Sequence, residues 1–85
     1  MARATKATLL ALDPWLNEVR QLKIEGLVEK ANGAFYQRRN GILHFHEDDN
    51  GVHADVKVGG EWQRVAVDRA TGRRQVIRLL REQYT

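Results

Sequence analysis

Apolar and polar residues alternate along residues 42–58, which is the pattern of two half-buried β-strands joined by a tight turn. Asn50-Gly51 marks the turn, because a type I′ turn needs positive φ at both central residues and these two residue types tolerate it. Counting outward from this turn places His46 opposite Asp55. One face of the hairpin is then apolar, and the other gathers all three histidines of the chain with acids and a lysine. The ionisable face holds His44, His46, His53, Asp48, Asp55 and Lys57.

Turn-forming pairs recur at intervals of eight to ten residues: Asn32-Gly33, Asn40-Gly41, Asn50-Gly51 and Gly59-Gly60. This rhythm predicts an antiparallel meander of four strands, with a fifth at the edge. The strands are expected at residues 34–39, 42–47, 52–58 and 61–67, and the edge strand at residues 27–31. Counting from the last turn places Ala54 opposite Val65.

The same counting assigns the aromatic residues to the two faces of the sheet. Tyr36 is predicted in the core opposite Phe45, and Phe35 on the open face. Trp62 falls on the histidine face by this count, so we expect a bulge near Gly59-Gly60 that turns its indole inward. The row predicted across the open face consists of Phe35, His46, Asp55 and Arg64.

Two segments outside the meander have helical periodicity. Asp13-Pro14 is typical of an N-cap followed by proline at the first helical position, and Gly26 ends the helix. Residues 1–12 form either an extra helical segment or a flexible arm. Thr71 caps a final helix whose apolar stripe consists of Val76, Leu79, Leu80 and Tyr84. We therefore expect one α+β domain over residues 1–85, with both helices packed on the apolar face of the sheet.

Composition narrows the class of protein. The 85 residues include no cysteine and no serine, which excludes disulfides, thiolate metal sites and catalysis by a serine or cysteine nucleophile. The longest apolar run, residues 9–12, is far shorter than the roughly 20 residues that a membrane-spanning helix needs. We expect a soluble, cytoplasmic protein with no bound cofactor and no membrane partner.

The net charge of +3 is unevenly distributed, and arginine outnumbers lysine ten to four. Five arginines and no acid lie within residues 69–81. Because a guanidinium group binds phosphate or carboxylate through two parallel hydrogen bonds, this segment predicts a surface for nucleic acid or for an acidic protein. A solvated face of an ordinary amphipathic helix has the same composition. The candidate partner-binding residues are Arg73, Arg74, Arg78 and Arg81, extended by Arg38 and Arg39 in a hairpin turn.

The histidine face offers a second kind of chemistry. His44 and His46 lie about 7 Å apart on one side of a strand, and His53 and Asp55 are their neighbours on the adjacent strand. These four residues are candidate metal ligands or acid-base groups. Lys57 beside His44 repels a cation, so we expect no metal. A metal-free, ribonuclease-like reaction would use one histidine as the base, but an open sheet face also carries such charge pairs without any catalytic role.

Two resemblances extend this interpretation. Small bacterial proteins of uncharacterised function resemble residues 27–84 through the stretches Phe35-Tyr-Gln-Arg38, Leu43-His-Phe-His46 and Gly51-Val-His-Ala-Asp-Val56. This resemblance implies a bacterial α+β protein and carries no activity. The order of helix, meander and arginine-bearing helix is similar to the double-stranded-RNA-binding domain and to small RNA-cleaving toxins of that fold. The stretch nearest to the family's phosphate-binding segment is Gly72-Arg73-Arg74-Gln75.

The sequence therefore predicts a small binding domain whose last helix contacts nucleic acid or an acidic partner. Two alternatives stay open. The histidine face could serve a metal-binding protein or an acid-base enzyme, and the free face or edge of the sheet could form a homodimer.

Overall fold

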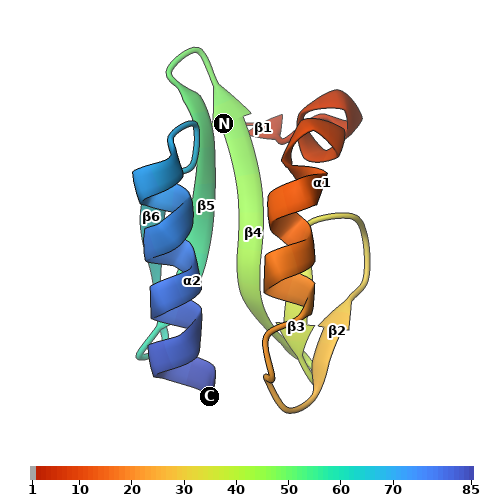
Figure 1. The fold of residues 1–85 in the computed structure, drawn as a ribbon, viewed down its shortest axis with the longest axis vertical. Helices are drawn as coiled ribbons and strands as arrows, with labels where there is room; N and C mark the ends of the chain where they lie inside the picture. Colours follow the sequence, from red (N-terminus) through yellow and green to blue (C-terminus); the bar gives the residue numbers. More distant parts are fainter. Residues whose placement is uncertain (1) are drawn as a thin grey trace.

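Figure 1 shows a computed structural model of the protein, which describes residues 2–85. Five strands follow one another in the order β2, β3, β4, β5, β6, each antiparallel to its neighbours, and a short β1 pairs with β4 to complete a six-stranded sheet. The predicted α+β class and antiparallel meander are confirmed, and β2 is the predicted strand at the edge. The elements are β1 (Ala2–Arg3), α1 (Lys6–Arg20), β2 (Leu27–Glu29), β3 (Phe35–Gln37), β4 (Asn40–Asp48), β5 (Gly51–Val58), β6 (Glu61–Ala66) and α2 (Ala70–Tyr84).

Helix α1 begins at Lys6, so the start predicted at Asp13 is wrong. The N-cap is Thr5, whose hydroxyl accepts a hydrogen bond from the N–H of Thr8 at 3.2 Å. A carboxylate from β4 completes the cap, because Glu47 accepts hydrogen bonds from the Thr5 N–H at 2.6 Å and from the Thr8 hydroxyl at 3.0 Å. This start depends on a residue far along the chain, which local capping rules do not include.

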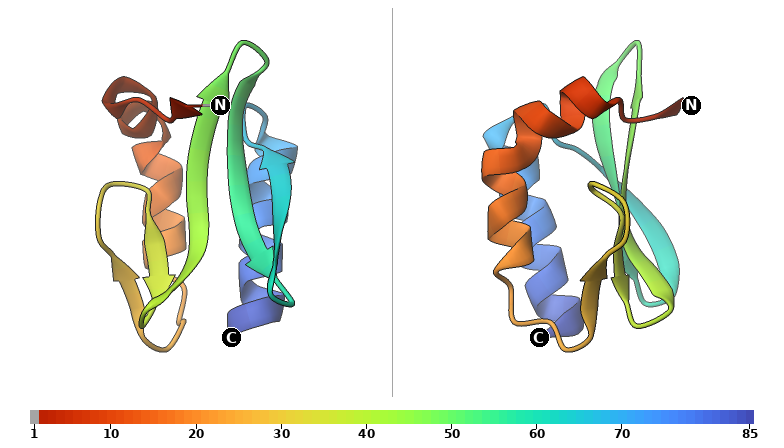
Figure 2. Two further views of the ribbon diagram at one scale, coloured as in Figure 1. Left: turned by 180° about the vertical axis from the view of Figure 1, so that it is seen from behind. Right: turned by 90° about the vertical axis from the view of Figure 1, so that its right-hand side faces the viewer.

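Residues 6–12 are therefore helical and continuous with the rest of α1, which selects the helical alternative for most of the N-terminal arm. Pro14 lies inside the helix and removes one backbone hydrogen bond from it. The helix bends in its middle (Figure 2), as expected where proline interrupts the hydrogen-bond ladder. The helix ends at Arg20 rather than at Gly26.

Strands β4 and β5 form the predicted hairpin, with a register that differs by two residues from the predicted count. Asp48 pairs with Gly51, so Asp49 and Asn50 are the two turn residues. The Asp48 carboxylate accepts a hydrogen bond from the Asn50 N–H at 2.8 Å, and Gly51 takes a φ of 120° as the first residue of β5. The Asp48 side chain thus moves the turn, because aspartate stabilises a turn by bonding to the backbone two residues on.

An even shift of register leaves every side chain on its predicted face. His46 pairs with His53 and not with Asp55, which instead pairs with His44. The prediction that all three histidines share one face is confirmed, while the predicted direct pair of His46 and Asp55 is wrong.

The turn before β4 also differs from the prediction. Gln37 pairs with Asn40, so the turn residues are Arg38 and Arg39, and Arg38 takes a positive φ of 57°. The turn predicted at Asn40-Gly41 is therefore wrong, and both of these residues belong to β4.

A bulge follows this turn and reverses the predicted faces of two aromatic residues. Tyr36 pairs with Gly41, whereas Phe35 pairs with Leu43, which leaves Ile42 as the extra residue. Ile42 and Leu43 are both buried. Phe35 lies in the core at 1% exposure, and Tyr36 lies on the open face, so the predicted placement of both residues is wrong.

Strand β6 follows the predicted register. Ala54 pairs with Val65 and Asp55 pairs with Arg64, as counted from the turn at residues 59–60. The pairing is regular, so the expected bulge is wrong, and Trp62 stays on the open face with 47% of its surface exposed.

Helix α2 begins at Ala70 after Arg69, and Thr71 lies in the first turn rather than at the N-cap, where it was predicted. Val76 and Leu80 of the predicted apolar stripe are fully buried.

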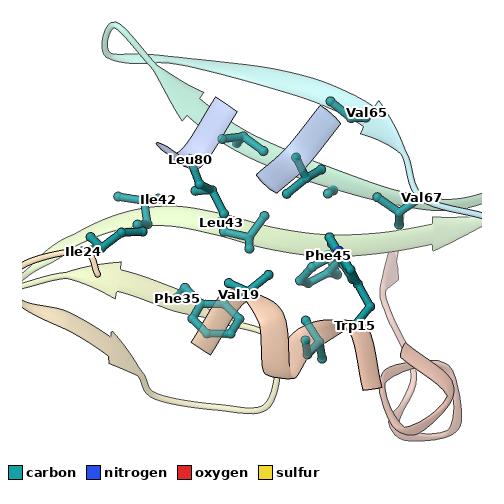
Figure 3. Close-up of a cluster of buried hydrophobic side chains, with 14 residues drawn as sticks. Trp15, Val19, Ile24, Phe35, Ile42, Leu43, Phe45, Val65, Val67 and Leu80 are labelled. Atoms are coloured by element: carbon teal, nitrogen blue, oxygen red, sulfur yellow. The ribbon is translucent and has the colours of Figure 1, made fainter. Parts of the chain in front are cut away.

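The core is one cluster of buried side chains from both helices and from one face of the sheet (Figure 3). In the two views of Figure 2, α1 and α2 lie on the same side of the sheet. The opposite face is the open face, and no element of residues 2–85 covers it. Neither helix of the described chain is long and apolar enough to cross a membrane.

Candidate functional site

The arginines of α2 line a groove between the two helices, with a volume of about 850 Å³. Arg74, Arg78 and Arg81 repeat at four- and three-residue spacing and therefore share one side of α2, and Arg73 is next to Arg74 in the sequence. All four predicted partner-binding residues of this helix line the groove: Arg73, Arg74, Arg78 and Arg81.

These four guanidinium groups have no carboxylate partner within the described residues. The arginines that form ion pairs in residues 2–85 are Arg20, Arg38 and Arg64. Glu18 and Glu82 also line the groove but make no ion pair with its arginines. Arg73 is partly committed to the fold, because its Nη1 donates a hydrogen bond to the carbonyl of Val67 at 3.1 Å. The remaining positive charge is available to a ligand.

The other two predicted arginines do not join this surface. Arg38 and Arg39 form the turn between β3 and β4, and neither lines the groove. Arg38 pairs instead with Glu25 at 3.2 Å, through side chains that are both highly exposed. The structure therefore brings together four of the six predicted residues.

The floor of the groove is apolar, and sequence reasoning missed it. Pro14 and Trp15 come from α1, and Ala70 and Ile77 come from α2. Trp15 is only 8% exposed, and its ring is nearly perpendicular to that of Phe45, with centroids 5.8 Å apart. The available signal was Ile77, an apolar residue on the arginine-bearing side of α2.

On the open face, Asp55 joins His46 to Arg64. Its Oδ2 lies 3.3 Å from His46 Nε2, and both carboxylate oxygens accept hydrogen bonds from Arg64, at 2.9 and 3.0 Å. The Arg64 guanidinium holds the pKa of Asp55 below its ordinary value, against the opposing effect of burial. The predicted row of His46, Asp55 and Arg64 is thus formed by side-chain contacts, although His46 reaches Asp55 diagonally.

His53 has a separate carboxylate partner. Its Nε2 lies 3.4 Å from Asp48 Oδ1, at the end of the hairpin. The Asn50 N–H, which donates to the same carboxylate, lowers the pKa of Asp48. The three histidines therefore share a face without converging on one point.

His44 lies between two aromatic rings and makes no ion pair within the described residues, although Asp55 is its partner on β5. Its ring centroid is 5.8 Å from that of Tyr36 and 5.0 Å from that of Trp62. Its Nε2 is buried and has no hydrogen-bond partner within the described residues. Burial lowers the pKa of His44, which favours the neutral imidazole at neutral pH.

This arrangement limits what the histidine face can do chemically. Within residues 2–85, no group of three or more histidine or acidic side chains is placed to hold a metal ion. His46 Nε2 lies 3.3 Å from Asp55 Oδ2 but makes no hydrogen bond to it within the described residues, so this carboxylate orients His46 only weakly. The candidates His44, His46, His53 and Asp55 thus form charge pairs and ring contacts.

Comparison with known proteins found no matching family model, curated protein or solved structure. The resemblances to small bacterial proteins and to the double-stranded-RNA-binding domain stay predictions.

Proposed function

We propose that this protein is a binding domain, and that the groove between α1 and α2 holds an acidic segment of a partner protein. One observation carries the proposal: four arginines without ion-pair partners in the described chain line a groove whose floor is apolar.

The chemistry of the groove favours a peptide segment over nucleic acid. Guanidinium groups bind both carboxylate and phosphate through paired hydrogen bonds, so the arginines alone do not distinguish a peptide from a nucleic acid. Apolar side chains of a ligand that contact Trp15 and Ile77 on the floor remove apolar surface from water, which favours binding. A nucleic-acid duplex presents phosphates and sugars at its surface and leaves such a floor unfilled. A segment that combines glutamate or aspartate with leucine-like residues fits both parts of the groove.

The expected binding is modest and depends on salt. Exposed ion pairs contribute at most about 1 kcal/mol each, and they weaken as salt screens them. The arginines would therefore speed association and orient the segment, while apolar contacts on the floor supply the rest of the binding energy. Arg74, Arg78 and Arg81 are the exposed members of the set. Arg74 and Arg78, which are four residues apart on one side of the helix, are the residues to change.

The test uses a fluorescent synthetic peptide in which pairs of glutamates alternate with leucine. We expect it to bind the whole protein at low salt and to dissociate at moderate salt, as measured by fluorescence anisotropy. The double variant Arg74→Ala/Arg78→Ala should bind about tenfold more weakly, equivalent to about 1.4 kcal/mol. Its circular dichroism and melting temperature should stay close to those of the unchanged protein, because both side chains are exposed.

A matched control removes the same charge elsewhere. Arg38→Ala/Arg39→Ala lies outside the groove and should leave peptide affinity almost unchanged. Equal losses in both double variants would mean that only net charge matters, which contradicts the proposal. A peptide of glutamate alone should bind more weakly than the leucine-containing one. If a DNA duplex binds through Arg74 and Arg78 and the peptide does not, the groove is a nucleic-acid-binding site and the proposal is wrong.

A further inference from the structure

A row of aromatic rings crosses the open face of the sheet. His44 of β4 lies between Tyr36 of β3 and Trp62 of β6, with ring planes inclined by 50° and 53°. Trp62 has 47% of its surface exposed, and Tyr36 and His44 are half-buried. The aromatic row, as we name Tyr36, His44 and Trp62, is therefore a continuous surface that solvent reaches. Val28, which pairs with Tyr36 and is 44% exposed, extends it towards the edge.

The backbone is shaped to assemble this row. The bulge between β3 and β4 turns Tyr36 to the open face, opposite Gly41. Because Gly41 has no side chain, the His44 ring can lie over it. A Cβ at this position would be 2.9 Å from His44 Nε2 and 3.5 Å from the Tyr36 ring. The glycine thus allows the first two rings of the row to meet.

Positive charges lie over the two outer rings. Lys30 Nζ is 4.6 Å from the centroid of Tyr36, and Lys57 Nζ is 4.8 Å from that of Trp62. Neither lysine forms an ion pair within residues 2–85. Asp55, which pairs with His44 on the neighbouring strand, already forms an ion pair with Arg64. The surroundings of the row therefore favour an anionic ligand.

We propose that the aromatic row binds single-stranded nucleic acid, with bases stacked on Trp62 and Tyr36 and phosphates held by Lys57 and Lys30. An unpaired strand has exposed bases that can stack on aromatic rings, and a phosphate beside each base that can bind a lysine. The exposed rings and flanking lysines of the row provide both kinds of contact. A duplex keeps its bases stacked inside and cannot use the rings. Each flexible lysine exchanges a cation–π contact, which is weak at an exposed site, for a phosphate contact.

This site is independent of the groove that carries the proposed peptide function. Figure 2 shows both helices on one side of the sheet. The groove lies between these helices, and the aromatic row lies on the opposite face of the sheet. Failure of either proposal leaves the other intact. Sequence reasoning missed the row because it placed Tyr36 in the core and turned Trp62 inward.

The experiment titrates the whole protein with short labelled oligothymidylate and oligouridylate at low salt and measures anisotropy. We expect both oligonucleotides to bind and to quench tryptophan fluorescence. Trp62→Ala should raise the dissociation constant about tenfold, equivalent to about 1.4 kcal/mol, because stacking on one base is lost. Trp62→Phe, which keeps a π-face, should restore most of the affinity. Tyr36→Ala is the second variant, and it should also weaken binding.

The control is Arg74→Ala/Arg78→Ala, which changes the opposite side of the molecule and should leave oligonucleotide affinity within about twofold. Three results would overturn the proposal: no binding at low salt, equal affinity of Trp62→Ala and the unchanged protein, or equal affinity for a duplex of the same length. Sedimentation of the protein alone gives a further decisive result. A dimer at micromolar concentration that Trp62→Ala dissociates, without oligonucleotide binding, would assign the row to a homodimer interface instead.

Discussion

Gly72 is a residue of α2 at which the helix lies close against the backbone of β6. A Cβ at this position would lie 1.7 Å from the carbonyl oxygen of Ala66 and 2.9 Å from its carbonyl carbon. These are backbone atoms, so the contact cannot be relieved by rotating a side chain. The first turn of α2 therefore depends on glycine at this position to pack on the sheet.

We expect Gly72→Ala to lower the free energy of unfolding by about 2–4 kcal/mol, because α2 must move away from β6 to make room. Urea denaturation followed by circular dichroism measures this change. Thr71→Ala is the matched control, since Thr71 is exposed in the same turn, and its effect should stay within about 0.5 kcal/mol. A loss at Gly72 no larger than that of the control would show that the helix moves freely here.

His44 makes stability depend on pH in a defined direction. Burial lowers its pKa in the folded protein, whereas in the unfolded chain the imidazole titrates near about 6.5. The unfolded state thus binds more protons, and stability falls as pH drops from about 7 through 6.5 towards the lower folded pKa. Above about pH 7, this contribution is fully present.

His44→Phe keeps a ring in the aromatic row but does not titrate, so its stability should change less between about pH 7 and pH 5. Urea denaturation of both proteins across this range tests the difference. Arg64 and Arg20 lower the pKa values of the Asp55 and Glu29 carboxyls. These carboxyls therefore lose their contributions to stability only below about pH 4.5, outside the range in which the two proteins are compared. Parallel pH profiles for the two proteins would refute the assignment to His44.

At the scale of elements, one arginine connects α1 to the edge of the sheet. Arg20, in the last turn of α1, donates two hydrogen bonds to Glu29 of β2, at 2.7 and 3.0 Å. Its Nη1 also donates to Asp13 at 2.9 Å and to Asn17 at 2.8 Å. Arg20 and Glu29 stabilise each other's charged forms, so the pKa of Glu29 is lowered and that of Arg20 is raised. This set of contacts holds the edge strand β2 beside the helix.

Arg20→Met should lower the free energy of unfolding by about 1.5–3 kcal/mol, because the partly buried Glu29 carboxylate loses its charged partner. Adding Glu29→Gln should recover part of this loss, since no charge is then left unpaired. Arg38→Met is the control, because the pair of Arg38 with Glu25 is exposed and its removal should change little. Urea denaturation of all four proteins forms the test, and equal effects of the Arg20 and Arg38 variants would contradict it.

The elements themselves were largely predictable, while their exact connections were not. Spacing of turn residues predicted the meander, and alternation predicted which face carries the histidines, because both are local properties of the chain. The turn at Asn50-Gly51 was misplaced because the Asp48 side chain binds the Asn50 N–H and moves the turn. The start of α1 was misplaced because its cap includes Glu47 from β4.

At the scale of the whole molecule, the two candidate sites lie on opposite sides. The groove arginines were predictable from the sequence, because they follow one another on a single helix. The groove floor was not, because residues of two helices form it, among them Trp15 of α1 and Ile77 of α2. The aromatic row was hidden for a similar reason, since a bulge places Tyr36 and regular pairing places Trp62. Sites built from one element could thus be predicted, and sites assembled across elements could not.

The most direct test of the central claim is a map of amide and indole chemical shifts during titration of the whole protein with the glutamate–leucine peptide. We predict that the Trp15 indole N–H and the amides of Ile77 and Arg78, in the groove, shift as the peptide binds. The signals of His44 and Trp62, on the open face, should stay in place. Shifts confined to the open face, or no shifts at low salt, would contradict the assignment of the groove as the partner-binding site.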